Sequence, residues 1–271
     1  MTESALTATA IAAEFALTLL GLGLLWRLRF SAEARARSAP PTLAAWEAPL
    51  SEFFLFLWLM VLCGLVVQLG AGYAIRRLPF STDENLSLAG TTAHVGALAG
   101  IFLFRRFFAT TASAPAHTGL NPLLSGAATF LLALPVVYAV GFAWQGALGL
   151  CGFELEKQGL VDVLQNSRSV AFQALMILMA TVVVPVTEES FFRAGLFRYT
   201  RTRLPRWASL LAPACLFGAL HANLATFAPL VALGVIFSLA YERTGRIGTA
   251  MVAHGLFNLH TVALIFAGLG T

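Results

Sequence analysis

The sequence carries little charge. Only 11% of its 271 residues are Asp, Glu, Lys or Arg, whereas a soluble globular domain usually carries about 25%. Hydrophobic residues make up 58% of the chain. This composition excludes a soluble globular enzyme, a disordered chain and a nucleic-acid-binding protein.

Cysteine is also scarce, and the spacing of the cysteines indicates no disulfide framework. Cys63, Cys151 and Cys215 lie far apart, each inside or beside an apolar run, and no CxxC pair occurs. We therefore expect small buried hydrophobic residues rather than disulfides or a cysteine-ligated metal.

Long apolar runs are what the chain does have. Crossing about 30 Å of hydrocarbon takes roughly 20 apolar residues. Only helices and closed barrels satisfy the backbone in lipid, and these runs are too long for barrel strands. We predict an all-α polytopic membrane helical bundle of about eight transmembrane helices. The predicted spans are 5–26, 53–75, 86–104, 123–150, 169–199, two short spans within the uncharged stretch 207–241, and 247–269.

The basic residues lie mostly between the spans and predict an orientation. Of 17 Lys and Arg, twelve fall in the loops after spans one, three, five and seven, and four fall in the other loops. The positive-inside rule then places both termini outside and the arginine-rich loops in the cytoplasm. We expect an integral protein of the bacterial inner or plasma membrane, anchored by a first span that is not a cleaved signal.

Ionisable groups inside a span cost at least about 2.5–3.5 kcal/mol each at mid-bilayer, so they suggest function. The first such group is Glu188-Glu189, followed by Arg193. Arg193 lies four residues after Glu189, on the same helical face and in the favourable order. We expect Glu189 and Arg193 to neutralise each other and Glu188 to stay unpaired, as suits a general base. The alternative is an ion-pair cluster at the membrane interface.

Two further polar groups fall at a similar depth. His221 ends the run Phe217-Gly-Ala-Leu-His, and His254 and Asn258 share one helical face. Gly255 leaves room for a close backbone or a substrate. At 1.5 Å per residue, Glu188, His221 and His254 lie about 15, 22 and 12 Å from the nearest arginine cluster. We therefore predict one shared, hydrated pocket that opens to the cytoplasm, although each group alone could instead form a hydrogen bond between packed helices.

The remaining polar residues indicate less. Glu14 and His94 are lone groups, for which we expect packing, snorkelling or pairing. His260 lies about 240° around the helix from His254 and should face elsewhere. Asn223 lies near the predicted turn and is expected to cap or bend it. Ser190 lies about 200° from Glu188 and should face away.

The three segments resemble the motif set of the CPBP family, which comprises CAAX proteases and bacteriocin-processing membrane proteins. That family carries Glu-Glu-x-x-x-Arg, then Phe-x-x-x-His, then His-x-x-x-Asn. Here these motifs stand in the same order on consecutive predicted spans. The resemblance covers about residues 170–265. It indicates a catalytic CPBP-like core of spans five to eight in residues 169–271, in a single integrated domain with spans one to four in residues 1–150.

The resemblance implies an intramembrane endopeptidase. Glu188 and His221 would activate a water, and His254 and Asn258 would hold the oxyanion. Glu189 and Arg193 would orient the site. The implied partners are the lipid bilayer and a membrane-anchored protein or peptide, with a prenylated CAAX-type tail as one substrate class and other membrane-anchored peptides as another. Nucleic acid is not an expected partner.

A metal cofactor stays open at this point. Glu188, His221 and His254 would make a His₂Glu zinc set with one position free for water. Glu189 would then be a candidate base. No HExxH motif demands zinc, and Glu188 can also act without a metal, so we favour the metal-free version.

Two readings compete with the protease. One is a non-catalytic membrane protein of the same fold, such as a bacteriocin-immunity or scaffold protein, although the motif positions are intact. The other is a proton-coupled transporter, since intramembrane Glu, His and Arg also line proton relays. The absence of an evident internal repeat counts against a transporter.

Overall fold

The predicted helical bundle is confirmed. The computed structural model describes residues 3–36, 43–44, 46–108, 121–153, 163–164, 166–167 and 169–269, and within these ranges it has helices and no strand. The main helices are α1 (Glu3–Leu25), α2 (Ala32–Ala36), α3 (Leu50–Ile75), α4 (Thr82–Phe107), α5 (Pro122–Leu150), α7 (Val170–Leu178), α8 (Val184–Glu189), α9 (Arg198–Thr200), α10 (Arg206–Leu220), α11 (Leu224–Thr244) and α12 (Ile247–Phe266). Three π-helical stretches join them: Trp26–Phe30, Met179–Val183 and Ser190–Phe197.

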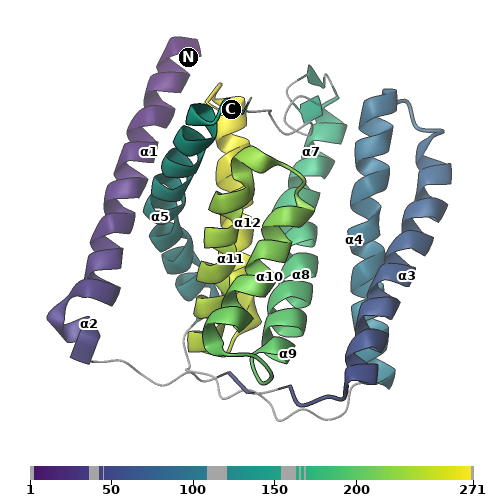
Figure 1. Cartoon of the computed structure of the whole chain (residues 1–271). Helices are drawn as coiled ribbons and strands as arrows, with labels where there is room; N and C mark the ends of the chain where they lie inside the picture. The colour runs from purple at the N-terminus through teal and green to yellow at the C-terminus, as the bar shows by residue number, and fades with distance from the viewer. Residues whose placement is uncertain are drawn as a thin grey trace.

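The helices form a bundle with two outlying elements (Figure 1). The hairpin of α3 and α4 lies on one side, α1 lies on the other beside α5, and α7 to α12 fill the middle. Both ends of the described chain lie at the same end of the bundle. This arrangement agrees with the even number of passes that the sequence predicts.

Within the described residues, seven helices are long and apolar enough to cross a membrane, by length and composition. The predicted sixth span is the exception, because α10 has only 15 residues. Its length is about 22 Å, which falls short of a hydrocarbon layer of about 30 Å. A helix of this length is too short to cross that layer by itself, and the residue that follows its last turn is His221.

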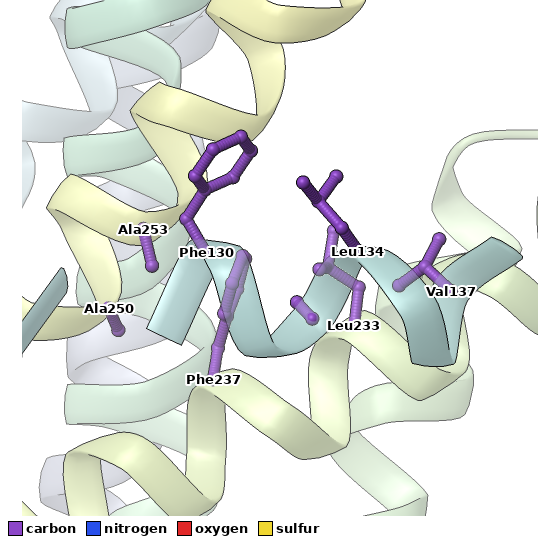
Figure 2. Packing of buried hydrophobic residues seen from close by; sticks show 8 residues of the cluster. Phe130, Leu134, Val137, Leu233, Phe237, Ala250 and Ala253 are labelled. Carbon is purple, nitrogen blue, oxygen red and sulfur yellow. The ribbon is translucent and has the colours of Figure 1, made fainter. Parts of the chain in front are cut away.

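A buried core joins the two halves of the sequence (Figure 2). Large side chains from α5 and α11 meet small ones from α12, which lets the three helices approach closely. The members of this core are Phe130, Ala133, Leu134, Val137, Leu233, Phe237, Ala250 and Ala253. Because Ala253 directly precedes His254, this packing sets the rotation of α12 about its axis and so the direction in which His254 points.

A ring cluster attaches the α3–α4 hairpin to the middle of the bundle. Trp46 makes edge-on contacts with Phe53, Phe56 and Phe104 of the hairpin and with Tyr199 of α9. Each ring pair of this kind adds about 0.5–1.5 kcal/mol beyond its buried area. The cluster holds α4 against the helix that carries the Glu-Glu motif.

The cysteines do not lie where the sequence suggested. Cys151 and Cys215 are exposed and Cys63 is half-buried. In a membrane protein an apolar residue gains little from burial, because lipid tails are as apolar as the protein core. The expectation of three buried cysteines was therefore wrong.

Candidate active site

The Glu-Glu motif sits on an irregular part of one long helical rod, Val170–Thr200. The α-helical turn Val184–Glu189 lies between the π-helical stretches Met179–Val183 and Ser190–Phe197. Pro185 has no backbone N–H to donate, so the normal helical ladder is interrupted just before the motif. Short π-helical segments are frequent at functional sites, since they turn side chains out of the regular register.

Glu189 and Arg193 form the predicted ion pair. Arg193 Nη1 donates to Glu189 Oε1 over 2.8 Å, and the two side chains are 1% and 0% exposed. Arg193 Nη2 also donates to the carbonyl of Gly234 over 3.1 Å, and Ser238 Oγ shares that carbonyl. The guanidinium further packs over three aromatic rings, those of Phe192, Phe217 and Phe237.

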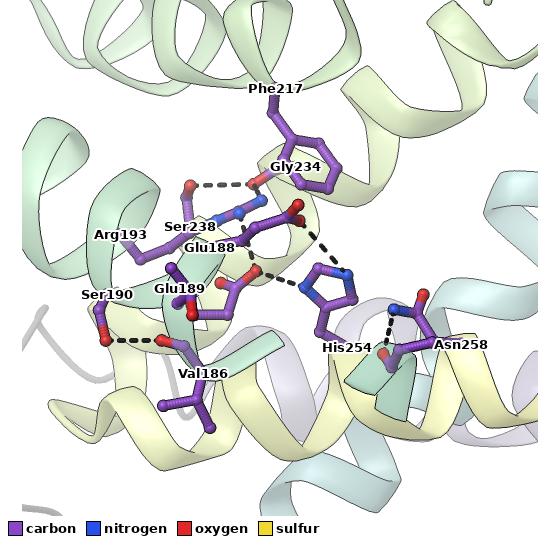
Figure 3. Close-up of polar contacts among 12 residues, drawn as sticks. Val186, Glu188, Glu189, Ser190, Arg193, Phe217, Gly234, Ser238, His254 and Asn258 are labelled. Atoms are coloured by element: carbon purple, nitrogen blue, oxygen red, sulfur yellow. Dashed lines mark hydrogen bonds and ion pairs between the residues drawn. The ribbon is translucent and has the colours of Figure 1, made fainter. Parts of the chain in front are cut away.

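His254 links this buried pair to Glu188 (Figure 3). Its Nδ1 lies 2.9 Å from Glu189 Oε1, and its Nε2 lies 3.8 Å from Glu188 Oε2. A carboxylate paired with Arg193 can only accept, so we assign the hydrogen to Nδ1 of His254. Its Nε2 is thereby directed at Glu188.

Glu188 has fewer partners than its neighbour. Its Oε2 is buried and makes no hydrogen bond within the described residues, and His254 Nε2 lies 3.8 Å from it. Glu189 Oε2 and Arg193 Nε are two further buried atoms without a hydrogen bond in the described part of the chain. Unsatisfied buried polar atoms are rare and mark sites of strain or function. Glu189 pairs with Arg193 as predicted, whereas Glu188 is not wholly unpaired, because His254 lies within ion-pair distance of it.

His221 and Asn258 come to the same place from two other helices. His221 Nδ1 lies 2.7 Å from the carbonyl oxygen of Phe217. That oxygen can only accept, which assigns the hydrogen to Nδ1 and leaves Nε2 as an acceptor in the neutral ring. Asn258 Nδ2 donates one N–H to the carbonyl of Ala180 over 2.8 Å, and its second N–H stays available.

Glu188, His221, His254 and Asn258 all line one cavity of about 600 Å³. Most of its wall is apolar, built from α5, α7, α11 and α12, with members such as Val137, Leu230, Leu233, Phe257, Val262 and Ile265. A cavity of this size and composition is typical of ligand sites, where a few polar groups orient a mainly apolar ligand.

The direction of the cavity can be compared with the predicted orientation. Beyond the four polar residues, its lining comes from the parts of α5, α11 and α12 farther from the arginine clusters. Its outer wall includes the exposed Phe142 and Gln145. If the arginine-rich loops are cytoplasmic, the cavity extends away from the cytoplasm. The prediction that the pocket opens to the cytoplasm and the prediction that both termini lie outside therefore do not both hold for this cavity.

A metal centre does not fit the residues as they are arranged. Among the residues that the structure describes, no three His, Cys, Asp or Glu side chains gather closely enough to hold an ion. In the expected zinc set of Glu188, His221 and His254, both histidines have their Nδ1 atoms engaged, which leaves Nε2 as the only ring nitrogen that could bind a metal. No chemical step below involves a metal.

The minor polar residues mostly behave as expected. Ser190 points away from the site and donates to the carbonyl of Val186 (Figure 3). Asn223 caps α11 by accepting from the backbone N–H of Thr226. His260 faces away from His254 and instead contacts Glu14 over 2.5 Å.

His94 is the residue whose placement the sequence did not predict. It lies on α4, and its backbone carbonyl lies 3.3 Å from Thr187 Oγ1, whose shorter hydrogen bond goes to the carbonyl of Val183 over 2.8 Å. The only signal in the sequence was the presence of a histidine within an apolar span, which by itself indicates packing as readily as function.

Comparisons with known proteins relate this chain to membrane peptidases. Residues 170–260 match the family model described as type II CAAX prenyl endopeptidase Rce1-like. A curated relative, "Putative membrane peptidase YdiL" of Bacillus subtilis (strain 168), is 26% identical over 220 residues, covering 76% of this chain and 88% of that protein. No solved structure matches the chain. The comparisons confirm the resemblance to the CPBP family and support a membrane protease in general.

Proposed function

We propose that this chain, whose residues 170–260 match the CPBP family of membrane proteases, is an intramembrane endopeptidase that hydrolyses a peptide bond of a membrane-associated protein or peptide. One observation carries the proposal. The Oε2 atom of Glu188 is buried without a hydrogen-bond partner among the described residues, 3.8 Å from His254 Nε2, and the Glu188 side chain lines a cavity that His221 and Asn258 also line.

The attack of water on the peptide carbonyl needs a base that takes a proton from the water. The Nε2 of His221 accepts a hydrogen bond from the water, and Glu188 takes a proton from it. The oxygen then adds to the carbonyl carbon of the substrate, and the carbonyl electron pair moves to its oxygen.

The resulting oxyanion needs hydrogen-bond donors. Asn258 supplies its second N–H, and the protonated ring of His254 supplies Nε2–H while its Nδ1 stays 2.9 Å from Glu189 Oε1. Glu188 then returns its proton to the leaving nitrogen, the C–N bond breaks, and a carboxylic acid and an amine result. Arg193 touches no reacting atom and holds Glu189 in place.

The substrate class follows from the walls of the cavity. An apolar cavity within the bundle suits a membrane-anchored segment better than a soluble peptide. A prenylated CAAX-type tail is one candidate, and an unmodified membrane-anchored peptide is the other. The same geometry without turnover would serve a bacteriocin-immunity or scaffold protein, which is the alternative function.

The test is cleavage by the purified protein in liposomes, using membrane-anchored peptides with and without a prenyl group. We expect the Glu188→Gln variant, which keeps the size of the side chain but cannot take the proton, to lose about 10²–10⁴-fold in kcat. Glu14→Gln, which alters an intramembrane carboxylate on α1, is the matched control and should cleave normally. Wild-type rates in both Glu188→Gln and His221→Ala would remove the proposed mechanism.

The role of zinc is tested in the same assay. We expect full activity after dialysis against a chelator, because no step needs a metal. Activity that disappears with the chelator and returns with added zinc would replace this mechanism with a zinc-dependent one. Unchanged biological output from inactive variants would instead favour the scaffold function.

A further inference from the structure

Two phenylalanine rings pack against the polar groups of the site. Phe217 on α10 and Phe237 on α11 are both fully buried, at 0% exposure. Each ring contacts the same two groups. The guanidinium carbon of Arg193 lies 4.8 Å from the centroid of the Phe217 ring and 5.4 Å from that of the Phe237 ring. The centroid of the His254 ring lies 5.8 Å and 5.5 Å from the same two centroids.

These rings restrain His254 in a way that its hydrogen bond does not. The bond between Nδ1 and Glu189 Oε1 fixes one atom of the imidazole, whose rotation about χ2 is otherwise broad. Its Nε2 lies 3.8 Å from Glu188 Oε2, which is too long for a hydrogen bond. The Phe217 ring meets the imidazole plane at 84° and the Phe237 ring meets it at 31°. Because two rings contact the imidazole at different angles, their packing limits the plane that it can adopt.

Phe217 also restrains the second histidine of the site. Its ring lies 4.8 Å from the His221 ring at an angle of 65°, and its backbone carbonyl accepts from His221 Nδ1 over 2.7 Å. His221 directly follows the last residue of α10, so Phe217, one turn earlier, holds the imidazole against the end of that helix. Phe237 makes no ring contact with His221 in the described part of the chain. One phenylalanine therefore contacts both imidazoles, and the other contacts only His254.

We propose that Phe217 and Phe237 are positioning residues, which hold the imidazole of His254 in its orientation toward the two glutamates, while Phe217 also holds that of His221. This inference rests on the proposed function, since it assigns roles within the same site. Neither phenylalanine is among the described residues that line the cavity, so a substrate in the cavity does not touch them. A leucine in place of either ring fills apolar space without a flat face, and the imidazoles then leave the orientation that the chemical step needs.

Leucine substitutions test these roles in the peptide-cleavage assay. We expect Phe217→Leu to lower kcat at least ten-fold with KM within two-fold of wild type, because misplacing a catalytic group by about 1 Å can cost about 100-fold. Phe237→Leu should lower kcat by a smaller factor, since it loosens one histidine rather than two. Wild-type kcat in Phe217→Leu would overturn the proposal, whatever the value of KM.

Phe192→Leu is the matched control. Phe192 is also buried and packs on Arg193 and on the Phe217 ring, but it makes no ring contact with a histidine in the described part of the chain. The substitution should lower the unfolding midpoint in detergent by an amount similar to Phe217→Leu and keep kcat within two-fold of wild type. Equal losses of kcat in the two variants would overturn the proposal, because general packing would then explain both.

Two further comparisons keep the result separate from folding and from the proposed function. If Phe217→Leu does not fold, Phe217→Met takes its place with the same expected result, since the flexible side chain of methionine fills irregular gaps. If Glu188→Gln is inactive and the Phe217 variant has normal kcat, only this inference fails. If Glu188→Gln is fully active, the proposed function fails.

Discussion

Two adjacent glutamates in this protein are placed in opposite environments by their partners. Glu189 accepts from Arg193 and from His254, whereas Glu188 Oε2 accepts from neither. The four-residue spacing to Arg193 predicted which of the two would be paired, because i and i+4 share a helical face. That spacing could not predict that His254 would touch both carboxylates, since His254 arrives on another helix.

Removing the cation of the buried pair should destabilise the fold. Arg193→Met leaves Glu189 buried and without its main counter-charge, and losses of this kind cost about 3–5 kcal/mol. We expect a clearly lower midpoint of thermal unfolding for the protein in detergent. The double variant Arg193→Met with Glu189→Leu removes both charges and should recover much of that stability. A midpoint equal to wild type in Arg193→Met would show that the pair does not stabilise the fold by this amount.

At the scale of elements, glycines decide how closely the helices approach. A Cβ on Gly255 would lie 2.5 Å from the carbonyl oxygen of Thr181, so α12 packs directly on the π-helical stretch before the motif. This approach brings Asn258 within reach of the Ala180 carbonyl. The sequence suggested that Gly255 makes room for a backbone or a substrate, and the structure shows that it makes room for a backbone.

The α3–α4 hairpin offers a matched test of such contacts. A Cβ on Gly96 would overlap the carbonyl of Cys63, whereas a Cβ on Gly90 of the same helix meets nothing within 4 Å. We expect Gly96→Ala to lower the unfolding midpoint by forcing α3 and α4 apart. Gly90→Ala should leave it unchanged or raise it, since Ala favours a helix by up to about 1 kcal/mol over Gly. Equal effects of both substitutions would contradict this close packing.

At the scale of the whole molecule, the arginine distribution and the position of the cavity together predict the side of the membrane toward which the cavity extends. The arginine-rich loops should be cytoplasmic, and the cavity extends toward the other end of the bundle, where α5 ends at Leu150. A substrate that uses this cavity would then enter from the outer half of the membrane. The orientation of the chain therefore decides which pool of peptides the enzyme can meet.

Cys151, which is exposed at the end of α5, reports the orientation directly. With Cys63 and Cys215 replaced by Ser, a membrane-impermeant maleimide should label Cys151 in intact cells. Introducing a cysteine at Arg201, in the loop between α9 and α10, supplies the opposite control, which should react only after permeabilisation. The reverse labelling pattern would show that the chain has the opposite orientation and that the cavity opens to the cytoplasm.

The sequence by itself determined the bundle, most of its spans and the identity of the polar groups at the site. Composition and span length decide whether a segment belongs in lipid, and both can be counted along the chain. Only the tertiary structure decided that the cavity extends away from the arginine clusters and that His254 lies near both Glu188 and Glu189. These features depend on how distant helices pack against one another, and local periodicity holds no information about a neighbour that arrives from elsewhere in the chain.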